Sequence, residues 1–278
     1  MEKVWLITGC STGFGRELAK AALKNGDKVA VTARKTSDIE NIVAGEDNAI
    51  SVALDVTDGG QIKSAVNAVM EKWGRIDVLV NNAGIGYFGA VEESEDEAVR
   101  KMFEINFFGL AKMTQAVLPI MRKQRSGHIV NISSIGGLRA FPAVGFYNAT
   151  KFAVDGLSES LAKEVAPLGI KVTIVAPSGF RTDWAGRSAE DTSIKIADYS
   201  ETAKVNQNTI RGNSGNQAGD PVLAAKAIIK AVESANPPMR LLLGAAALTG
   251  GRAKLEELKA DFDAWEETTV GADSPKKD

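Results

Sequence analysis

The sequence has very little of two residue types that carry redox and metal chemistry, with one cysteine and one histidine among 278 residues. A single cysteine, Cys10, cannot form a disulfide within the chain. The lone histidine, His128, lies at the start of a predicted strand, where a structural role is favoured over metal ligation. These shortages exclude a fold held by internal disulfides, and we predict no metal site.

Basic blocks and long apolar runs are missing as well. The formal net charge is −2 and the isoelectric point is near 5.7, which argues against nucleic acid or an anionic membrane as the main partner. No apolar run reaches about 18 residues, and no signal-peptide pattern precedes the first predicted strand. We therefore expect a cytoplasmic protein that acts on a small molecule, with neither nucleic acid nor membrane as a partner.

The sequence does contain a regular alternation of short apolar segments with helical ones. Apolar, β-rich segments predict strands at residues 4–8, 29–31, 50–54, 78–80, 128–132, 171–175 and 240–243. Helices are predicted at residues 16–24, 61–73, 95–121, 147–165, 221–233 and 251–265, with an interruption near Pro119. Repeated strand–helix units with right-handed crossovers predict an α/β fold. We expect a doubly wound parallel sheet of the Rossmann type, with about seven strands and helices on both faces.

The chain shows no internal linker, so we expect a single domain over residues 1–270. Residues 180–219 are polar and glycine-rich, and a long irregular segment inside a compact domain is usually a lid or a binding loop. We predict a substrate lid there. A disordered tail is expected at residues 271–278.

Three glycines, Gly9, Gly13 and Gly15, follow the first predicted strand and precede a helix. In that context they permit a tight turn and let backbone N–H groups approach a pyrophosphate at the helix N-terminus. The pattern is G-x-x-x-G-x-G rather than the commoner G-x-G-x-x-G, and nucleotide binding is favoured over simple turn chemistry. Cys10 lies inside this loop, where a reactive thiol is conceivable, but we favour no function for it.

Tyr147 and Lys151 are four residues apart at the start of a predicted helix, so they share one helix face. An ammonium there is expected to lower the phenol pKa from about 10, which would make the phenol an acid/base near neutral pH. Such a pair is weak evidence by itself. Ser134, thirteen residues upstream of Tyr147, and the glycine loop strengthen it because all three motifs occur in one chain.

Over about residues 1 to 245 the sequence resembles the short-chain dehydrogenase/reductase family. The resemblance rests on the Thr8–Gly15 loop, Asn81-Asn82-Ala83-Gly84, Asn106, Ser134, and Tyr147 with Lys151. It implies that Tyr147 is the acid/base and that Ser134 hydrogen-bonds the substrate oxygen. It also implies that Lys151 holds the nicotinamide ribose and lowers the Tyr147 pKa, and that Asn106 anchors a proton-relay water.

The resemblance further implies a nicotinamide cofactor, and the second strand favours NADP(H). Family members that prefer NAD carry an aspartate at the position of Ala33, whereas Arg34 and Lys35 follow here and suit a phosphate. One departure is Pro177-Ser178-Gly179, where the family has Pro-Gly directly. The expected cofactor contacts are Gly9, Ser11, Thr12, Gly13, Phe14, Gly15, Arg34, Lys35, Asp55, Val56, Asn82, Ala83, Gly84, Tyr147, Lys151, Pro177, Gly179 and Thr182.

We expect hydride transfer between the nicotinamide and a carbonyl/secondary-alcohol pair, a ketone or aldehyde that is fairly hydrophobic. The expected substrate contacts are Ser134, Phe141, Tyr147 and Trp184. The family associates through helices equivalent to residues 95–121 and 147–165, which implies a homodimer or homotetramer. Two alternatives are an NADP-binding regulatory or scaffold protein without catalysis and an enzyme resembling the nucleotide-sugar epimerases.

Overall fold

The computed structural model of the protein describes residues 2–186 and 189–274. Residues 275–278 of the predicted disordered tail lie outside these ranges. Among the described residues, no helix combines the length and the apolar character that crossing a membrane would need.

A seven-stranded sheet forms the centre of the fold, with the order β3-β2-β1-β4-β6-β7-β9 and every neighbouring pair parallel. The inner strands are buried along nearly their whole length, which explains their continuous apolar sequence. The predicted doubly wound sheet is confirmed. The strands are β1 (Val4–Ile7), β2 (Lys28–Ala33), β3 (Ala49–Ala53), β4 (Val78–Asn81), β6 (Gly127–Ile132), β7 (Ile170–Pro177) and β9 (Arg240–Leu243).

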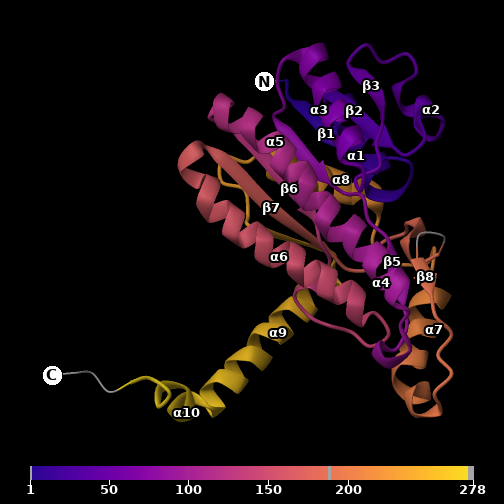
Figure 1. The fold of residues 1–278 in the computed structure, drawn as a ribbon, viewed down its shortest axis with the longest axis vertical. Helices are drawn as coiled ribbons and strands as arrows, with labels where there is room; N and C mark the ends of the chain where they lie inside the picture. Colours follow the sequence, from indigo (N-terminus) through magenta and orange to yellow (C-terminus); the bar gives the residue numbers. More distant parts are fainter. Residues whose placement is uncertain (1, 187–188, 275–278) are drawn as a thin grey trace.

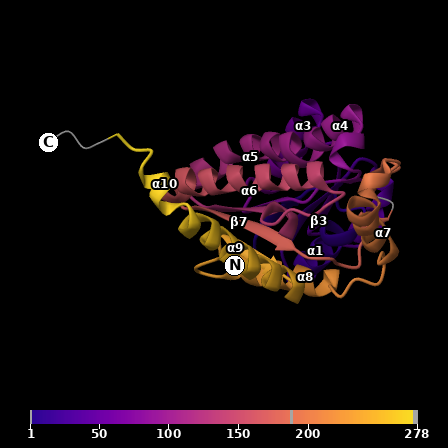
Figure 2. The same cartoon turned by 90° about the horizontal axis from the view of Figure 1, so that it is seen from below.

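Helices cover both faces of the sheet, as Figure 2 shows in a view along the layers. One face carries α1 (Gly13–Lys24) and α8 (Pro221–Glu233), with the short α2 (Glu40–Val43) beside them. The opposite face carries α3 (Gly59–Trp73), α5 (Leu110–Gln124) and α6 (Gly145–Val165). Each layer buries its own apolar cluster against the sheet, so the site at the sheet edge rests on two packed cores.

The predicted long helix at residues 95–121 is interrupted at a different place from the one expected. It consists of α4 (Asp96–Phe103), a π-helical turn (Glu104–Gly109) and α5, and Pro119 lies inside α5. The expectation of a break near Pro119 was therefore wrong. Packing of α5 against β4 and β6 outweighs the loss of one backbone N–H at Pro119. The π-turn contains Asn106 instead.

The segment at residues 180–219 contains short helices, as expected, and one strand that was not expected. β8 (Ala189–Asp191) pairs in parallel with β5 (Gly86–Phe88) to form a separate two-stranded sheet. The described part of the segment also contains α7 (Val205–Gly212). In Figure 1 this unit lies beyond the carboxyl ends of the central strands, next to α4.

The C-terminal helix α9 (Ala245–Ala264) begins six residues before the predicted start at residue 251. The added turn is rich in alanine, a strong helix former, and the preceding Gly244 makes the turn from β9 with φ of +91°. α9 runs away from the body of the protein, and α10 (Glu266–Val270) lies at its far end (Figure 1).

Candidate active site

The predicted motifs converge at the carboxyl edge of the sheet. The strand order reverses between β1 and β4, because the chain places β2 and β3 on one side of β1 and β4 on the other. Ligands of doubly wound sheets bind beyond the strand ends at such a reversal. The glycine loop follows β1, residues 82–84 follow β4, and Ser134 follows β6. Segments far apart in sequence thus meet at one edge.

Asn82 fastens the glycine loop to the end of β4. Its Nδ2 donates hydrogen bonds to the carbonyl oxygens of Thr8 and Gly9, both at 2.9 Å. In return, the Thr8 hydroxyl oxygen accepts from the backbone N–H groups of Asn82 and Ala83, at 2.9 and 3.0 Å. These four bonds fix the shape of the loop within the protein itself.

The glycines of the loop are required by its backbone and by close contacts. Gly9 and Gly13 have φ of +71° and +58°, a region that favours glycine. A Cβ on Gly15 would lie 2.5 Å from both Asn82 Nδ2 and the Gly9 carbonyl oxygen. At the start of α1, Thr12 makes no side-chain capping bond and the first turn has no acidic residue. The first N–H groups and the positive end of the helix dipole therefore suit an anion.

A cluster of positive charge lies beside the loop. Arg34 and Lys35 are exposed just beyond β2, and no hydrogen bond or ion pair joins the Arg34 guanidinium to another described residue. Arg16, which our sequence reasoning missed, places its Nη1 3.4 Å from the carbonyl oxygens of Ser11 and Asp38. Arg16 could have been identified from the sequence by its position directly after Gly15. Two arginines thus border the glycine loop on the β2 side.

Asp55 and Val56 lie just beyond β3, the neighbour of β2. Asp55 Oδ1 accepts hydrogen bonds from the Thr57 backbone N–H at 2.9 Å and from the Thr57 hydroxyl at 2.7 Å. Val56 is buried against the π-turn, where a Cβ on Gly109 would lie 2.7 Å from Val56 Cγ2. Asp55 shapes its own loop, and Val56 joins the β3 end to the helix that carries Asn106.

Asn106 is buried in the π-turn and its side chain is fully engaged by the protein. Its Oδ1 accepts from the Ile85 backbone N–H at 2.8 Å. Its Nδ2 donates to the Ile85 carbonyl oxygen at 2.9 Å and to the Thr150 hydroxyl at 3.3 Å. The amide therefore ties the segment after Gly84 to helix α6, one turn from Tyr147.

Ser134, Tyr147 and Lys151 form one connected group. Ser134 begins a short turn at the end of β6, where its hydroxyl accepts from the Gly136 backbone N–H at 3.0 Å and lies near enough to the Tyr147 phenol to lower the pKa of that phenol. Tyr147 and Lys151 lie on the same side of α6, with Lys151 Nζ 5.6 Å from the centre of the Tyr147 ring. Lys151 Nζ donates to the carbonyl oxygen of Ile132 at 2.9 Å. All three side chains are thus held by β6 and α6.

The pKa of Tyr147 differs from our expectation. Burial raises the Tyr147 pKa to about 12, and the hydrogen bond from Ser134 lowers it only in part. We had expected Lys151 to bring this pKa toward neutrality. Lys151 is itself buried, and this burial lowers its pKa to about 8, although Asp155 acts in the opposite direction. Burial therefore dominates the pKa of both groups.

Asp155 is a buried carboxyl group that our sequence reasoning missed. It lies one helical turn after Lys151, and the Ser133 hydroxyl donates to its Oδ1 at 2.5 Å. Arg240 Nε lies 3.6 Å from Asp155 Oδ2. Burial raises the Asp155 pKa to about 6. Asp155 could have been identified from the sequence by its spacing of four residues from Lys151.

Aromatic rings cover the face of Tyr147. The Trp184 ring, from the segment after β7, has its centre 4.7 Å from that of Tyr147 and also packs against Phe88. Phe141 belongs to the same apolar cluster. The structure therefore brings Phe141 and Trp184 into one apolar cluster with Tyr147.

The departure at Pro177-Ser178-Gly179 is accommodated at the end of β7. Ser178 donates from its backbone N–H at 3.0 Å and from its hydroxyl at 3.3 Å to the Leu243 carbonyl oxygen, so the added residue is tied to β9. The following residues turn back toward the glycine loop. A Cβ on Gly13 would lie 3.4 Å from Thr182. Phe14 also packs edge-on against Phe180, with ring centres 5.0 Å apart.

The lone cysteine and histidine are buried. Cys10 donates its thiol to the Ile7 carbonyl oxygen at 3.2 Å, and burial raises its pKa to about 12, so the thiol is not activated. His128 Nε2 is 2.9 Å from the Thr173 hydroxyl, and burial lowers the His128 pKa to about 4. No cluster of residues suited to a metal ion occurs in the described part of the chain.

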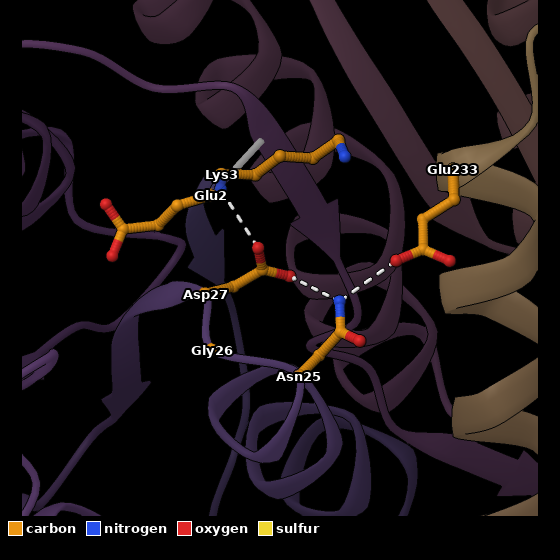
Figure 3. A pocket seen from close by; sticks show the side chains of 6 residues that line it. All are labelled: Glu2, Lys3, Asn25, Gly26, Asp27 and Glu233. Carbon is orange, nitrogen blue, oxygen red and sulfur yellow. Dashed lines mark hydrogen bonds between the residues drawn. The ribbon is translucent and has the colours of Figure 1, made fainter.

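A surface hollow lies at the opposite edge of the sheet, where β1 and β2 begin (Figure 3). There Asp27 accepts from the Lys3 backbone N–H at 2.9 Å and from Asn25 Nδ2 at 3.3 Å. Asn25 Nδ2 also donates to Glu233 Oε1 at 2.9 Å. None of the residues that line this hollow is a predicted site residue. The hydrogen bonds between them join β1 and β2 to α8.

The chain is similar to known proteins along most of its length. Residues 3–193 match a family model described as short chain dehydrogenase. Oxidoreductase BOA17 of Botryotinia fuckeliana is 40% identical over 274 residues, which cover 98% of this chain and 100% of that protein. The 3-ketodihydrosphingosine reductase of Bacteroides thetaiotaomicron is 41% identical over 243 residues, which cover 87% of this chain and 88% of that protein.

Solved structures show the same fold. A short-chain dehydrogenase from Streptomyces avermitilis has a TM-score of 0.92 and 44% identity, covering 99% of this chain and 100% of that one. A family member from Burkholderia phymatum in complex with NAD has a TM-score of 0.82, 26% identity and coverage of 94% and 95%. ElxO with NADP bound has a TM-score of 0.74, 32% identity and coverage of 90% and 100%. The family match, these relatives and the converging motifs together show that the chain is an oxidoreductase of the short-chain dehydrogenase/reductase family.

Proposed function

We propose that the protein is an NADP(H)-dependent reductase of hydrophobic ketones or aldehydes. The observation that carries this proposal is the placing of Ser134 beside Tyr147, with Lys151 on the same helix, at the sheet edge that also holds the glycine loop. A proton donor, an oxygen-binding hydroxyl and a phosphate-binding loop occur together there. Carbonyl reduction by a nicotinamide needs each of these.

The residues at the sheet edge fit a nicotinamide dinucleotide. The uncapped first turn of α1 and the glycine loop suit its diphosphate. Lys151 would hold the nicotinamide ribose, and Arg34 would bind the additional phosphate of NADP(H) in the absence of a carboxylate at Ala33. Relatives of known structure bind NAD or NADP. Arg34 is exposed and pairs with no other residue of the described ranges, which favours the phosphorylated form.

The bound nucleotide supplies the hydride, and the chain supplies the proton and the surroundings of the oxygen. With a pKa near 12, Tyr147 is protonated at neutral pH and can donate its phenolic proton to the substrate oxygen. The Ser134 hydroxyl donates a second hydrogen bond to that oxygen. After the transfer, the Lys151 ammonium lies 5.6 Å from the Tyr147 ring centre and stabilises the phenolate that has formed.

A hydrophobic substrate follows from the walls of the site. Trp184 and Phe141 gather around Tyr147, together with Phe88. The relative named 3-ketodihydrosphingosine reductase supports a ketone with a long apolar portion. We also propose that residues 180–219 act as a lid. Arg211 of α7 donates to the carbonyl oxygens of Ala185, Gly186 and Ala189 at 2.8–3.0 Å, so these parts of the segment are joined to each other.

The proposed homodimer or homotetramer has support on two helices. Phe108 of the π-turn is 44% exposed and Phe152 of α6 is 45% exposed. Large apolar side chains on the family's usual association helices are suited to an interface between copies.

The test is consumption of NADPH and of NADH by the purified protein with a panel of short- and long-chain ketones and aldehydes. We expect turnover with NADPH, faster for the apolar substrates. Tyr147→Phe should reduce turnover by roughly two to four orders of magnitude and leave NADPH binding nearly intact. Binding of NADPH without consumption against any substrate would contradict the enzyme assignment and favour a regulatory protein.

The cofactor assignment has a separate test. Arg34→Ala should weaken NADPH use mainly through its Michaelis constant, by about 1.5–3 kcal/mol for a charged hydrogen bond. Arg100→Ala, at an exposed arginine on α4, serves as the control. Equal use of NADH and NADPH by the wild type, or an unchanged preference in Arg34→Ala, would show that Arg34 does not select the cofactor.

A further inference from the structure

Helix α9 makes contact with the body only along its first part. Its early residues pack beside β9 and the turn after Ser134, where a Cβ on Gly251 would lie 3.1 Å from Leu242 Cδ1 and 3.4 Å from Leu138 Cδ2. From Lys259 to Ser274 every residue is exposed. Figure 1 shows this outer part and α10 standing clear of the rest of the chain. A helix without tertiary contacts is only marginally stable in water.

The exposed part of α9 carries an apolar stripe. Large apolar side chains occur at Leu248, Leu255, Leu258 and Phe262, and at Trp265 directly after the helix; with the small Gly251 these positions are separated by alternating intervals of three and four residues. Leu255, Phe262 and Trp265 are 60%, 67% and 66% exposed. This spacing places the stripe on one side of the helix and is typical of a seam between two packed helices. Clustered exposed apolar side chains mark an interaction surface.

The charges along α9 indicate which partner fits. The outer part, residues 258–267, has four acidic residues and one lysine. The inner part, residues 245–257, has two basic and two acidic residues, and Arg139 of the body lies close enough to lower the pKa of Glu257. The inner end is thus slightly positive and the outer end clearly negative. In an antiparallel pair, the negative outer end of each copy lies beside the positive inner end of the other. A parallel pair would instead bring the two acidic ends together.

We propose that the outer part of α9 is a dimerisation arm that packs against the same helix of a second copy, antiparallel and around a two-fold axis. Phe262 and Trp265 of one copy then cover Leu255 and Leu248 of the other. A two-fold axis makes the contact isologous, so one helix supplies both the aromatic end and the leucine end. This contact is separate from α5 and α6 and does not depend on the proposed catalytic function.

The first experiment measures the mass of the full chain by sedimentation equilibrium over micromolar concentrations. We expect Phe262→Glu to halve the mass of the assembly, or to weaken the association at least tenfold. Leu223→Glu, at a similarly exposed leucine (61%) of α8, should leave it unchanged. Because Phe262 is 67% exposed within its own chain, the substitution should leave the fold of that chain intact, as an unchanged circular dichroism spectrum would show. An assembly mass that Phe262→Glu leaves intact, or a monomeric wild type, would overturn the proposal.

The second experiment tests the direction of the two helices by disulfide cross-linking. The chain has no accessible native thiol, since Cys10 is buried. Leu255→Cys mixed with Phe262→Cys, the two positions that face each other in the proposed contact, should give a cross-linked pair under mild oxidation, and each variant alone should give much less. Cross-linking of each variant with itself, and not with the other, would indicate a parallel contact and contradict the antiparallel arrangement.

Discussion

Replacing Asp155 with asparagine should make the protein more stable at neutral pH. Burial raises the pKa of this carboxyl from 3.8 to about 6. A difference of about 2 units, at about 1.4 kcal/mol per unit, destabilises the folded state by about 3 kcal/mol once the group is ionised. Asparagine has the same shape and can still accept the hydrogen bond from Ser133. The raised pKa already includes the attraction of the partly exposed Arg240, so the net gain is about 3 kcal/mol.

The sign of the pH dependence follows from the raised pKa. Between pH 3.8 and about 6 the folded protein binds a proton at Asp155 that the unfolded chain has already released. The stability that comes from this group is therefore present in full below pH 3.8, falls as the pH rises through this window, and is lost above about pH 6. Asp155→Asn should remove this fall. Its advantage over the wild type should grow from pH 4 to pH 6 and then remain constant.

The assay is urea unfolding of both proteins at one protein concentration, at several pH values from 4 to 8. Glu159→Gln is the matched control, because Glu159 also contacts Arg240 but its side chain is 47% exposed. This control should lose a little stability at pH 7 and gain none. If Asp155→Asn were no more stable than the wild type at pH 7 and followed a parallel pH curve, the buried-carboxylate reasoning would be refuted.

Three further outcomes are expected. Asp155→Asn should move the alkaline loss of NADPH binding to lower pH, because Asp155 raises the Lys151 pKa of about 8. If fluorescence titrations gave the same pH dependence of NADPH binding for both proteins, Asp155 would not control the Lys151 pKa. Gly15→Ala should weaken NADPH binding at least tenfold, since a Cβ would lie 2.5 Å from Asn82 Nδ2, and calorimetry that gave wild-type affinity would contradict this. Amide hydrogen exchange in residues 180–219 should slow when cofactor and substrate bind, and equal protection in both states would count against a lid.

The sequence alone determined the fold class and predicted the residues of the candidate site. Alternating strand and helix patterns predicted all seven strands of the central sheet, because buried parallel strands are continuously apolar. The glycine loop, Ser134, Tyr147 and Lys151 were identifiable because their spacing is local or belongs to a known motif. Their chemistry depends on residue type, which the sequence states directly. The bounds of α8 and β9 also agree with prediction, since a proline start and a short apolar run mark them.

Only the tertiary structure decided the properties that depend on burial and on distant neighbours. The Tyr147 pKa rises instead of falling because Trp184 and the surrounding core exclude water, and no local pattern reports that. The π-turn at Asn106 depends on close packing of Gly109 against Val56. Asp155 acquires its raised pKa from β6 and β9, which are far from it in sequence. Desolvation and contact between remote segments arise only when the chain is folded. The order of residues therefore predicted which side chains form the candidate site, whereas packing determined their pKa values.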